Sequence, residues 1–373
     1  MIFGSATLHS VPWEILIKDF RAEHSASSCD SLRGYAERLF EFVKAQEVLF
    51  PESIRRAVFV ENALESALSI ARVIGDYDDV TNGSEPERIE KWRSRFKEVA
   101  ISIDRHEIPT PLTKEDIDAA VATYAAEIDA RIRTSLKSSV LDETFVPRLA
   151  ELGVRLMMKR YDVLFPWTGV VIGGYGAKDY FPSLEVHRCY GFLDRRFLSR
   201  QEDSARIDHA TPAVIMPFAM TSMIDTFRSG ISPDVHNNVN EATRKGLHAF
   251  AEKLKARVGI AAPIDGLDAL VDEAVESHQE SWYQPILHEH HVPMACVIDS
   301  IPVTEMAAMA KSLIELESLK ERVTRPSESV GGAIDVAVIS KHDGFVWVDR
   351  KHYFRPELNP RFFSRQYAPR VTT

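Results

Sequence analysis

The feature that most constrains the fold is a strand-like stretch near the end of the sequence, GGAIDVAVISKHDGFVWVDRKHYF, at residues 331–354. In an extended strand the apolar side chains here divide between two faces: Ile334, Val336 and Val338 on one, Ala337 and Ile339 on the other. A strand that is apolar on both faces is typical of one buried between two layers. His342-Asp343-Gly344 then predicts a tight turn into a second strand, 345–348.

Composition permits a large core and excludes some functions. The chain has 373 residues, 45% of them hydrophobic, which is enough for one big domain or two ordinary ones. Its net charge of −10 argues against a nucleic-acid partner, because phosphate binding needs clustered cations. No window approaches the ~20 apolar residues of a membrane span, so we expect no membrane partner and a cytoplasmic protein. Cys29, Cys189 and Cys296 are widely spaced, which favours reduced thiols and indicates neither a zinc site nor any other cofactor.

The remaining periodicities predict a mixture of helices and strands. After an apolar start and a Gly-Ser turn, helices are predicted from Pro12, from the cap at Asp30 or Ser31, and over 61–73, 113–137, 145–161, 221–230, 234–300 and 304–323. Strands are predicted over 168–175 and 184–192, as a hairpin, and over 213–218. The segment from 75 to 111 is polar and contains Asn82-Gly83 and Pro86, which predicts a surface insertion.

Three blocks of this sequence resemble one family in the same order. They are MIFGSATLHSVPWEILIKDF with DSLRGYAERLFEF, then GVVIGGYGAKDYFPSLEVHRCYGF, then GGAIDVAVISKHDGF. Together they resemble the proteasome β-type branch of the N-terminal nucleophile (Ntn) hydrolases. The resemblance implies an α+β fold, a four-layer αββα sandwich that is incomplete at the N-terminus. It implies a single domain over 1–373 with helical insertions at about 75–140 and 231–300 and a tail from about 360 to 373.

The resemblance also implies what chemistry to look for. These hydrolases use a mature N-terminal Thr, Ser or Cys whose own α-amine is the base. Here residue one is Met1, so the sequence predicts a homologue with no nucleophile and no peptidase activity; the alternative is an active peptide or amide hydrolase in a longer parent chain. Gly4 matches the family glycine whose backbone N–H helps form the oxyanion hole, and it equally fits a glycine needed only for the turn. Ser5 and Thr7 are predicted to serve in a turn. Self-association as a homo-oligomer or ring is also implied, with no particular substrate.

A cluster of histidines at His288-Glu289-His290-His291 is the rival site. On a strand, His288 and His290 would share a face and, with a carboxylate from elsewhere, could hold a metal in a metal-dependent enzyme. The competing interpretation is a solvated loop before Pro293.

Overall fold

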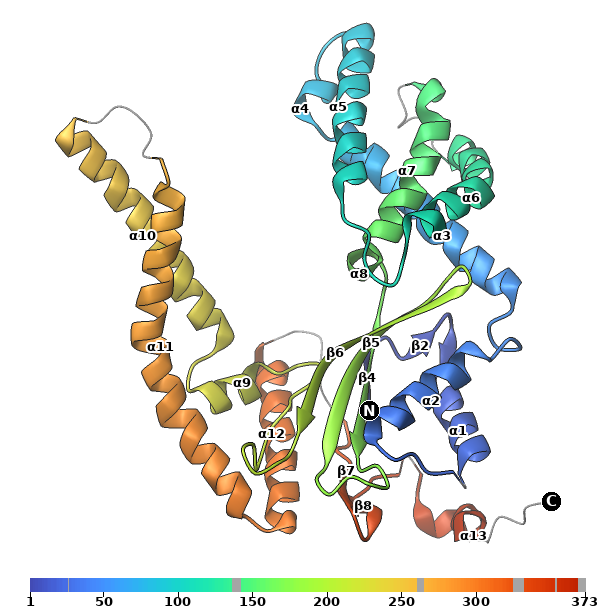
Figure 1. Cartoon of the computed structure of the whole chain (residues 1–373), viewed down its shortest axis with the longest axis vertical. Helices are drawn as coiled ribbons and strands as arrows, with labels where there is room; N and C mark the ends of the chain where they lie inside the picture. The colour runs from blue at the N-terminus through green and yellow to red at the C-terminus, as the bar shows by residue number, and fades with distance from the viewer. Residues whose placement is uncertain (26, 136–141, 260–264, 325–331, 353, 368–373) are drawn as a thin grey trace. The chain divides into compact units, whose positions relative to one another are not determined.

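The computed structural model describes residues 1–25, 27–135, 142–259, 265–324, 332–352 and 354–367. The chain is α+β, with helices and antiparallel sheets (Figure 1). It forms two compact units where the sequence predicts one domain: Met1–Ala205, called unit 1, and Arg206–Thr373, called unit 2.

Unit 1 contains a four-stranded sheet in the order β1-β4-β5-β6. Its strands are β1 (Ile2–Gly4), β4 (Thr168–Gly174), β5 (Ser183–Leu193) and β6 (Arg196–Arg206), the last ending one residue into unit 2. The β4–β5 pair is antiparallel with Thr168 opposite Cys189, which confirms the predicted hairpin. Strand β1 pairs antiparallel with β4, so the start of the chain joins a strand more than 160 residues later in the sequence.

Two helices cover one face of this sheet. They are α1 (Trp13–His24) and α2 (Leu32–Lys44), which follow the short pair β2 (Thr7–Leu8) and β3 (Val11–Pro12). Helix α2 begins where the Ser31 side chain accepts a hydrogen bond from Gly34 N, as the sequence predicts. The apolar side chains between helices and sheet form one core cluster: Leu8, Trp13, Leu16, Ala36, Leu39, Phe40, Phe42, Val43, Phe50, Val170, Cys189, Phe192 and Phe197.

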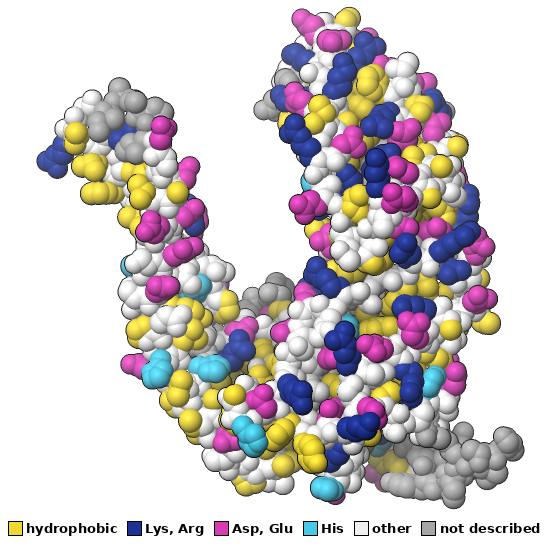
Figure 2. Space-filling view, in the orientation of Figure 1, with side chains coloured by type: hydrophobic (Ala, Val, Ile, Leu, Met, Phe, Trp, Pro, Cys, Tyr) yellow, Lys and Arg dark blue, Asp and Glu magenta, His cyan; other side chains and the backbone are white. Residues whose placement is uncertain are grey.

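A second core cluster holds the remaining helices of unit 1. These are α3 (Glu52–Gly75), α4 (Asp78–Thr81), α5 (Glu85–Arg105), α6 (Lys114–Ser135), η1 (Glu143–Phe145), α7 (Val146–Lys159) and α8 (Tyr161–Leu164). On the face seen in Figure 2, basic and acidic side chains are interspersed over these helices. Some join neighbouring helices, as Arg131 of α6 does with Glu61 of α3 at 2.7 Å.

Most of the segment 75–111, which the sequence predicts to be a surface insertion, is helix α5, and one face of this helix is buried. Ser84 and Glu87 form a capping box at its start, each side chain bonding the other residue's backbone. Trp92, Phe96 and Ile103 recur on one helix face and are buried in the core.

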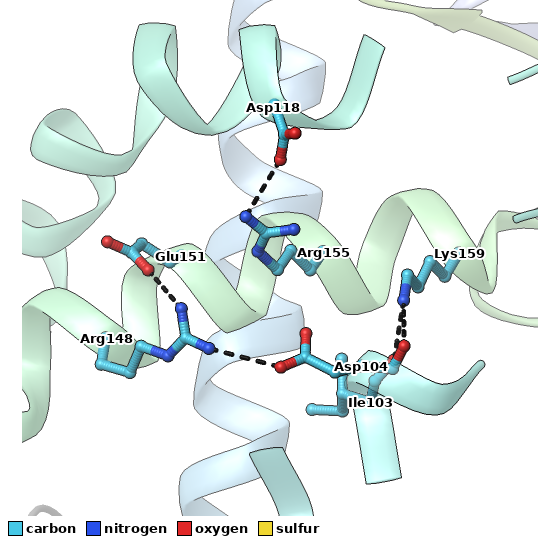
Figure 3. A network of polar contacts seen from close by, with 7 residues as sticks. All are labelled: Ile103, Asp104, Asp118, Arg148, Glu151, Arg155 and Lys159. Carbon is cyan, nitrogen blue, oxygen red and sulfur yellow. Dashed lines mark hydrogen bonds and ion pairs between the residues drawn. The ribbon is translucent and has the colours of Figure 1, made fainter. Parts of the chain in front are cut away.

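Polar contacts fasten α5 to α7 (Figure 3). The Lys159 Nζ donates hydrogen bonds to the carbonyl oxygens of Ile103 at 3.1 Å and Asp104 at 2.8 Å, near the end of α5. Carbonyls in the last turn of a helix lack the usual partner one turn further on, so the ammonium supplies a donor to them, and Ile103 O also accepts from His106 N at 3.2 Å. Burial lowers the pKa of Lys159. Arg148 bridges Asp104 and Glu151, and Arg155 reaches Asp118 of α6 at 3.1 Å.

Unit 2 is mostly helical. It contains α9 (Ser222–Ser229), α10 (Pro233–Val258), α11 (Leu267–Ser300), α12 (Val303–Thr324), η2 (Pro356–Leu358) and α13 (Pro360–Tyr367), the last within the predicted tail. The helix closed by Gly230 is confirmed, since Gly230 adopts φ +76 at its C-terminus. The strand predicted over 213–218 is wrong: these residues belong to no strand. Glu317 of α12 instead holds the start of α9, accepting from Met223 N at 2.7 Å.

The apolar stretch at residues 331–354 forms a hairpin of two strands, β7 (Val336–Ser340) and β8 (Gly344–Asp349). The predicted strand, turn and strand are therefore confirmed; Gly331 lies outside the described residues. The prediction that this hairpin is buried on both faces is wrong for the described residues. The hairpin is a separate two-stranded sheet in which Val336 is buried but Phe345 is 56% and Trp347 43% exposed. No helix in the described ranges is both long and apolar enough to cross a membrane.

Candidate functional site

Gly4 ends β1 at a corner that only glycine adopts without strain. Its φ is +74, and an added Cβ would lie 2.9 Å from the Trp167 carbonyl oxygen. The next residue, Ser5, donates its N–H to that same oxygen at 3.1 Å. The left-handed backbone and the close carbonyl therefore explain why the turn needs glycine at position 4. The role of Gly4 in an oxyanion hole stays a prediction.

Substituting Gly4 by alanine is expected to lower the free energy of unfolding of unit 1 by about 1–2 kcal/mol, the cost of a left-handed L-residue. Gly173→Ala is the matched control on β4, because Gly173 has ordinary φ and its nearest atom to an added Cβ lies at 3.8 Å. Chemical denaturation of both variants measures the difference. Equal stability of the two would contradict the strained corner.

The turn after Gly4 opens onto a cavity of about 230 Å³. Its lining residues belong to both core clusters and the segments between them: Ser5, Thr7, Leu8, His9, Ser10, Val58, Asn62, Phe165, Pro166, Thr168, Cys189 and Tyr190. The Thr168 hydroxyl donates to Ser5 O at 2.9 Å and accepts from Trp13 Nε1 at 3.0 Å. Trp13 N donates to Ala6 O at 3.1 Å. The first turn is therefore tied to both β4 and α1.

His9 is held in the wall of the cavity by its backbone conformation and by a hydrogen bond. Its Nε2 accepts a hydrogen bond from Phe192 N at 2.6 Å, and a Cβ added to Gly191 would lie 2.5 Å from the same nitrogen. His9 and Ser10 both have left-handed backbone, with φ of 45 and 68. Burial lowers the pKa of His9 to about 4, so the imidazole is neutral near pH 7.

Acidification should therefore destabilise unit 1 through His9. His9 has a pKa near 6.5 in the unfolded chain and about 4 in the folded chain, so the unfolded chain binds more protons between these pH values. The free energy of unfolding is therefore highest above pH 6.5 and falls as the pH drops to about 4. The expected loss is about 2–3 kcal/mol. His9→Asn, which tolerates the left-handed backbone, should flatten this part of the pH profile, whereas His278→Gln at an exposed site should not. A His9→Asn profile parallel to the parent's would contradict the assignment.

The described lining of the cavity contains no activated nucleophile. Burial raises the pKa of the Cys189 thiol, which keeps it protonated. The Ser5 hydroxyl donates to Thr7 O at 2.8 Å, which confirms its predicted turn role. The Nε2 lone pair of His9 already accepts from Phe192 N, so that atom cannot also take a proton from a hydroxyl. The arrangement is suited to binding more than to nucleophilic attack.

The histidine cluster lies on a helix, neither on a strand nor in a loop. His288, His290 and His291 all fall within α11 and are exposed. Residues two apart on a helix point in different directions, so His288 and His290 do not share a face. The His290 ring lies against Gly230, where an added Cβ would be 2.2 Å from it. Across the part of the chain that is described, no three His, Cys, Asp or Glu side chains come together as a metal site.

Comparison with known proteins identifies no relative. No family model, no curated protein and no solved structure matches this chain. The site therefore has to be interpreted from its own geometry.

Sequence reasoning located Gly4, Ser5 and Thr7 but missed the cavity beside them. Its polar residues His9, Asn62 and Tyr190 come from three segments that lie far apart in the chain. No spacing or motif connects these segments, because β1–β4 pairing and the α3 position bring them together. One sign was available in the sequence: Gly191 lies inside a predicted strand, where glycine often marks a close approach of another group.

Proposed function

We propose that this chain is a proteasome β-type Ntn hydrolase homologue without peptidase activity. The observation that carries the proposal is the pairing of β1 with β4, in which Gly4 lies opposite Thr168. It joins the first and second resembling blocks in one antiparallel sheet. Helices α1 and α2, which belong to the first block, cover one face of that sheet.

The third block supports the finer proposal of a four-layer sandwich. Strands β7 and β8 carry apolar side chains on both faces, and all of these but Val336 are at least partly exposed, so both faces are free to be covered by further layers. An experimental structure of the chain, alone or in its natural assembly, tests this arrangement. Two stacked antiparallel sheets would support it, and hairpins remote from one another would overturn it.

The chemistry of the cavity supports the absence of peptidase activity, because Cys189 is protonated and His9 has its Nε2 occupied. The purified chain is assayed with a panel of fluorogenic peptides, beside an active hydrolase of this class and the variant Ser5→Ala. We expect hydrolysis equal to that of buffer for both forms of the chain. Hydrolysis that persists through repurification and disappears in Ser5→Ala would contradict the proposal.

Self-association belongs to the same proposal, since subunits of this family assemble through helix faces. Light scattering after size exclusion is the measurement. A mass that is a multiple of 42.1 kDa would support a homo-oligomer or ring, and 42.1 kDa at all concentrations would overturn that part of the proposal.

A further inference from the structure

We propose that the cavity beside Gly4 binds a small uncharged molecule with an apolar body and a hydrogen-bond acceptor. This inference is independent of the hydrolase proposal, because it rests only on the cavity in unit 1. Its volume of about 230 Å³ exceeds the ~150 Å³ of an engineered cavity that holds benzene. A molecule with one aromatic ring and one polar substituent therefore fits.

The absence of charge in the lining defines the ligand class. Among its described lining residues there is no Asp, Glu, Lys or Arg. His9 is neutral near pH 7 as well, because burial lowers its pKa to about 4. The pocket is partly open to solvent, so an ion that enters it would lose part of its hydration without gaining a counter-charge, which costs more than burying a neutral group. The geometry therefore selects uncharged ligands.

Two polar groups of the lining have unused hydrogen-bonding capacity. The Tyr190 side chain is 5% exposed, and its buried hydroxyl has no hydrogen-bond partner among the described residues. The Nε2 of neutral His9 accepts from Phe192 N, so the ring proton lies on Nδ1 and can be donated to a ligand. A buried polar group without a partner costs stability, and a ligand that supplies the partner recovers that cost. Both groups can donate, so the ligand needs an acceptor such as an amide or ketone oxygen.

The strained backbone next to these groups favours the same conclusion. His9 and Ser10 are consecutive non-glycine residues with φ of 45 and 68. Strain of this kind is held in place by surrounding structure and clusters at sites that bind or react. Here the hydrogen bond from Phe192 N to the His9 Nε2 is one of the contacts that hold this backbone in place.

Benzamide is the probe, because benzamidinium and benzoate share its shape and carry opposite charges. The full 373-residue chain is titrated with each at pH 7 and followed by ligand-observed NMR. We expect saturable binding of benzamide and none of the two ions over the same range. Val58→Phe, which adds a ring to the lining, should abolish benzamide binding. Equal binding of all three probes, no saturable benzamide binding, or binding unaffected by Val58→Phe would overturn the proposal.

Tyr190→Phe separates ligand binding from a merely structural role. Removing a hydroxyl that has no partner should leave the melting temperature unchanged or raised, while benzamide binding weakens by about three- to tenfold. Tyr180→Phe is the matched control, since Tyr180 is 90% exposed and distant from the lining. A Tyr190→Phe protein with a lower melting temperature and unchanged affinity for benzamide would show that the hydroxyl stabilises the fold. That result would overturn its role in binding.

Discussion

Trp13→Ala is expected to lower the free energy of unfolding of unit 1 by about 3–5 kcal/mol, the range found when a large buried aromatic is truncated. Trp13 is 1% exposed and belongs to the core between α1, α2 and the sheet. Its Nε1–H donates to Thr168 Oγ1 at 3.0 Å, and Thr168 in turn donates to Ser5 O. The substitution therefore removes packing and leaves the turn after Gly4 with one fewer support.

Chemical denaturation monitored by circular dichroism measures this loss, and Trp13→Phe grades it. Phenylalanine retains most of the apolar volume but lacks the Nε1 donor, so we expect a smaller loss, with about 1 kcal/mol from the hydrogen bond. If alanine and phenylalanine cost the same, packing is not the main contribution of Trp13. A loss below about 1 kcal/mol for alanine would contradict its placement in the core.

Gly153→Leu is expected to cost unit 1 at least about 3 kcal/mol, because the site is already filled. Gly153 lies in α7 where α7 crosses α3. An added Cβ would be 2.7 Å from both the Ala63 carbonyl oxygen and the Ala67 Cβ. Backbone cannot move aside as a flexible side chain can, so leucine forces the two helices apart.

The control is Gly75→Leu at the end of α3, where an added Cβ meets nothing within 4 Å. It should change stability by less than about 0.5 kcal/mol. Thermal and chemical unfolding of both variants give the comparison, and similar losses would refute the close α3–α7 contact. Val58 and Asn62 of α3 line the cavity, so Gly153→Leu should also weaken benzamide binding.

Local features of the fold were readable from the sequence alone. The alternation of β4 and β5 predicted a hairpin, and their pairing with Thr168 opposite Cys189 confirms it. Gly230 predicted the end of α9 because a left-handed residue closes a helix well, and its φ is +76. Such features depend on neighbours a few residues apart, so their physics is contained in the local sequence.

Contacts between distant segments were decided only by the tertiary structure. The sequence of α5 is highly charged, and its three buried residues became core because α3, α4 and α7 pack against this helix. The apolar sequence of β7 and β8 predicted burial. Among the described residues, however, these strands pair only with each other, and their apolar side chains apart from Val336 are at least partly exposed. Likewise, His9 lies beside Phe192 because β1 pairs with β4 and β4 with β5. The sequence shows how apolar each segment is. Which surfaces pack together depends on all segments at once, so it is decided only in the folded chain.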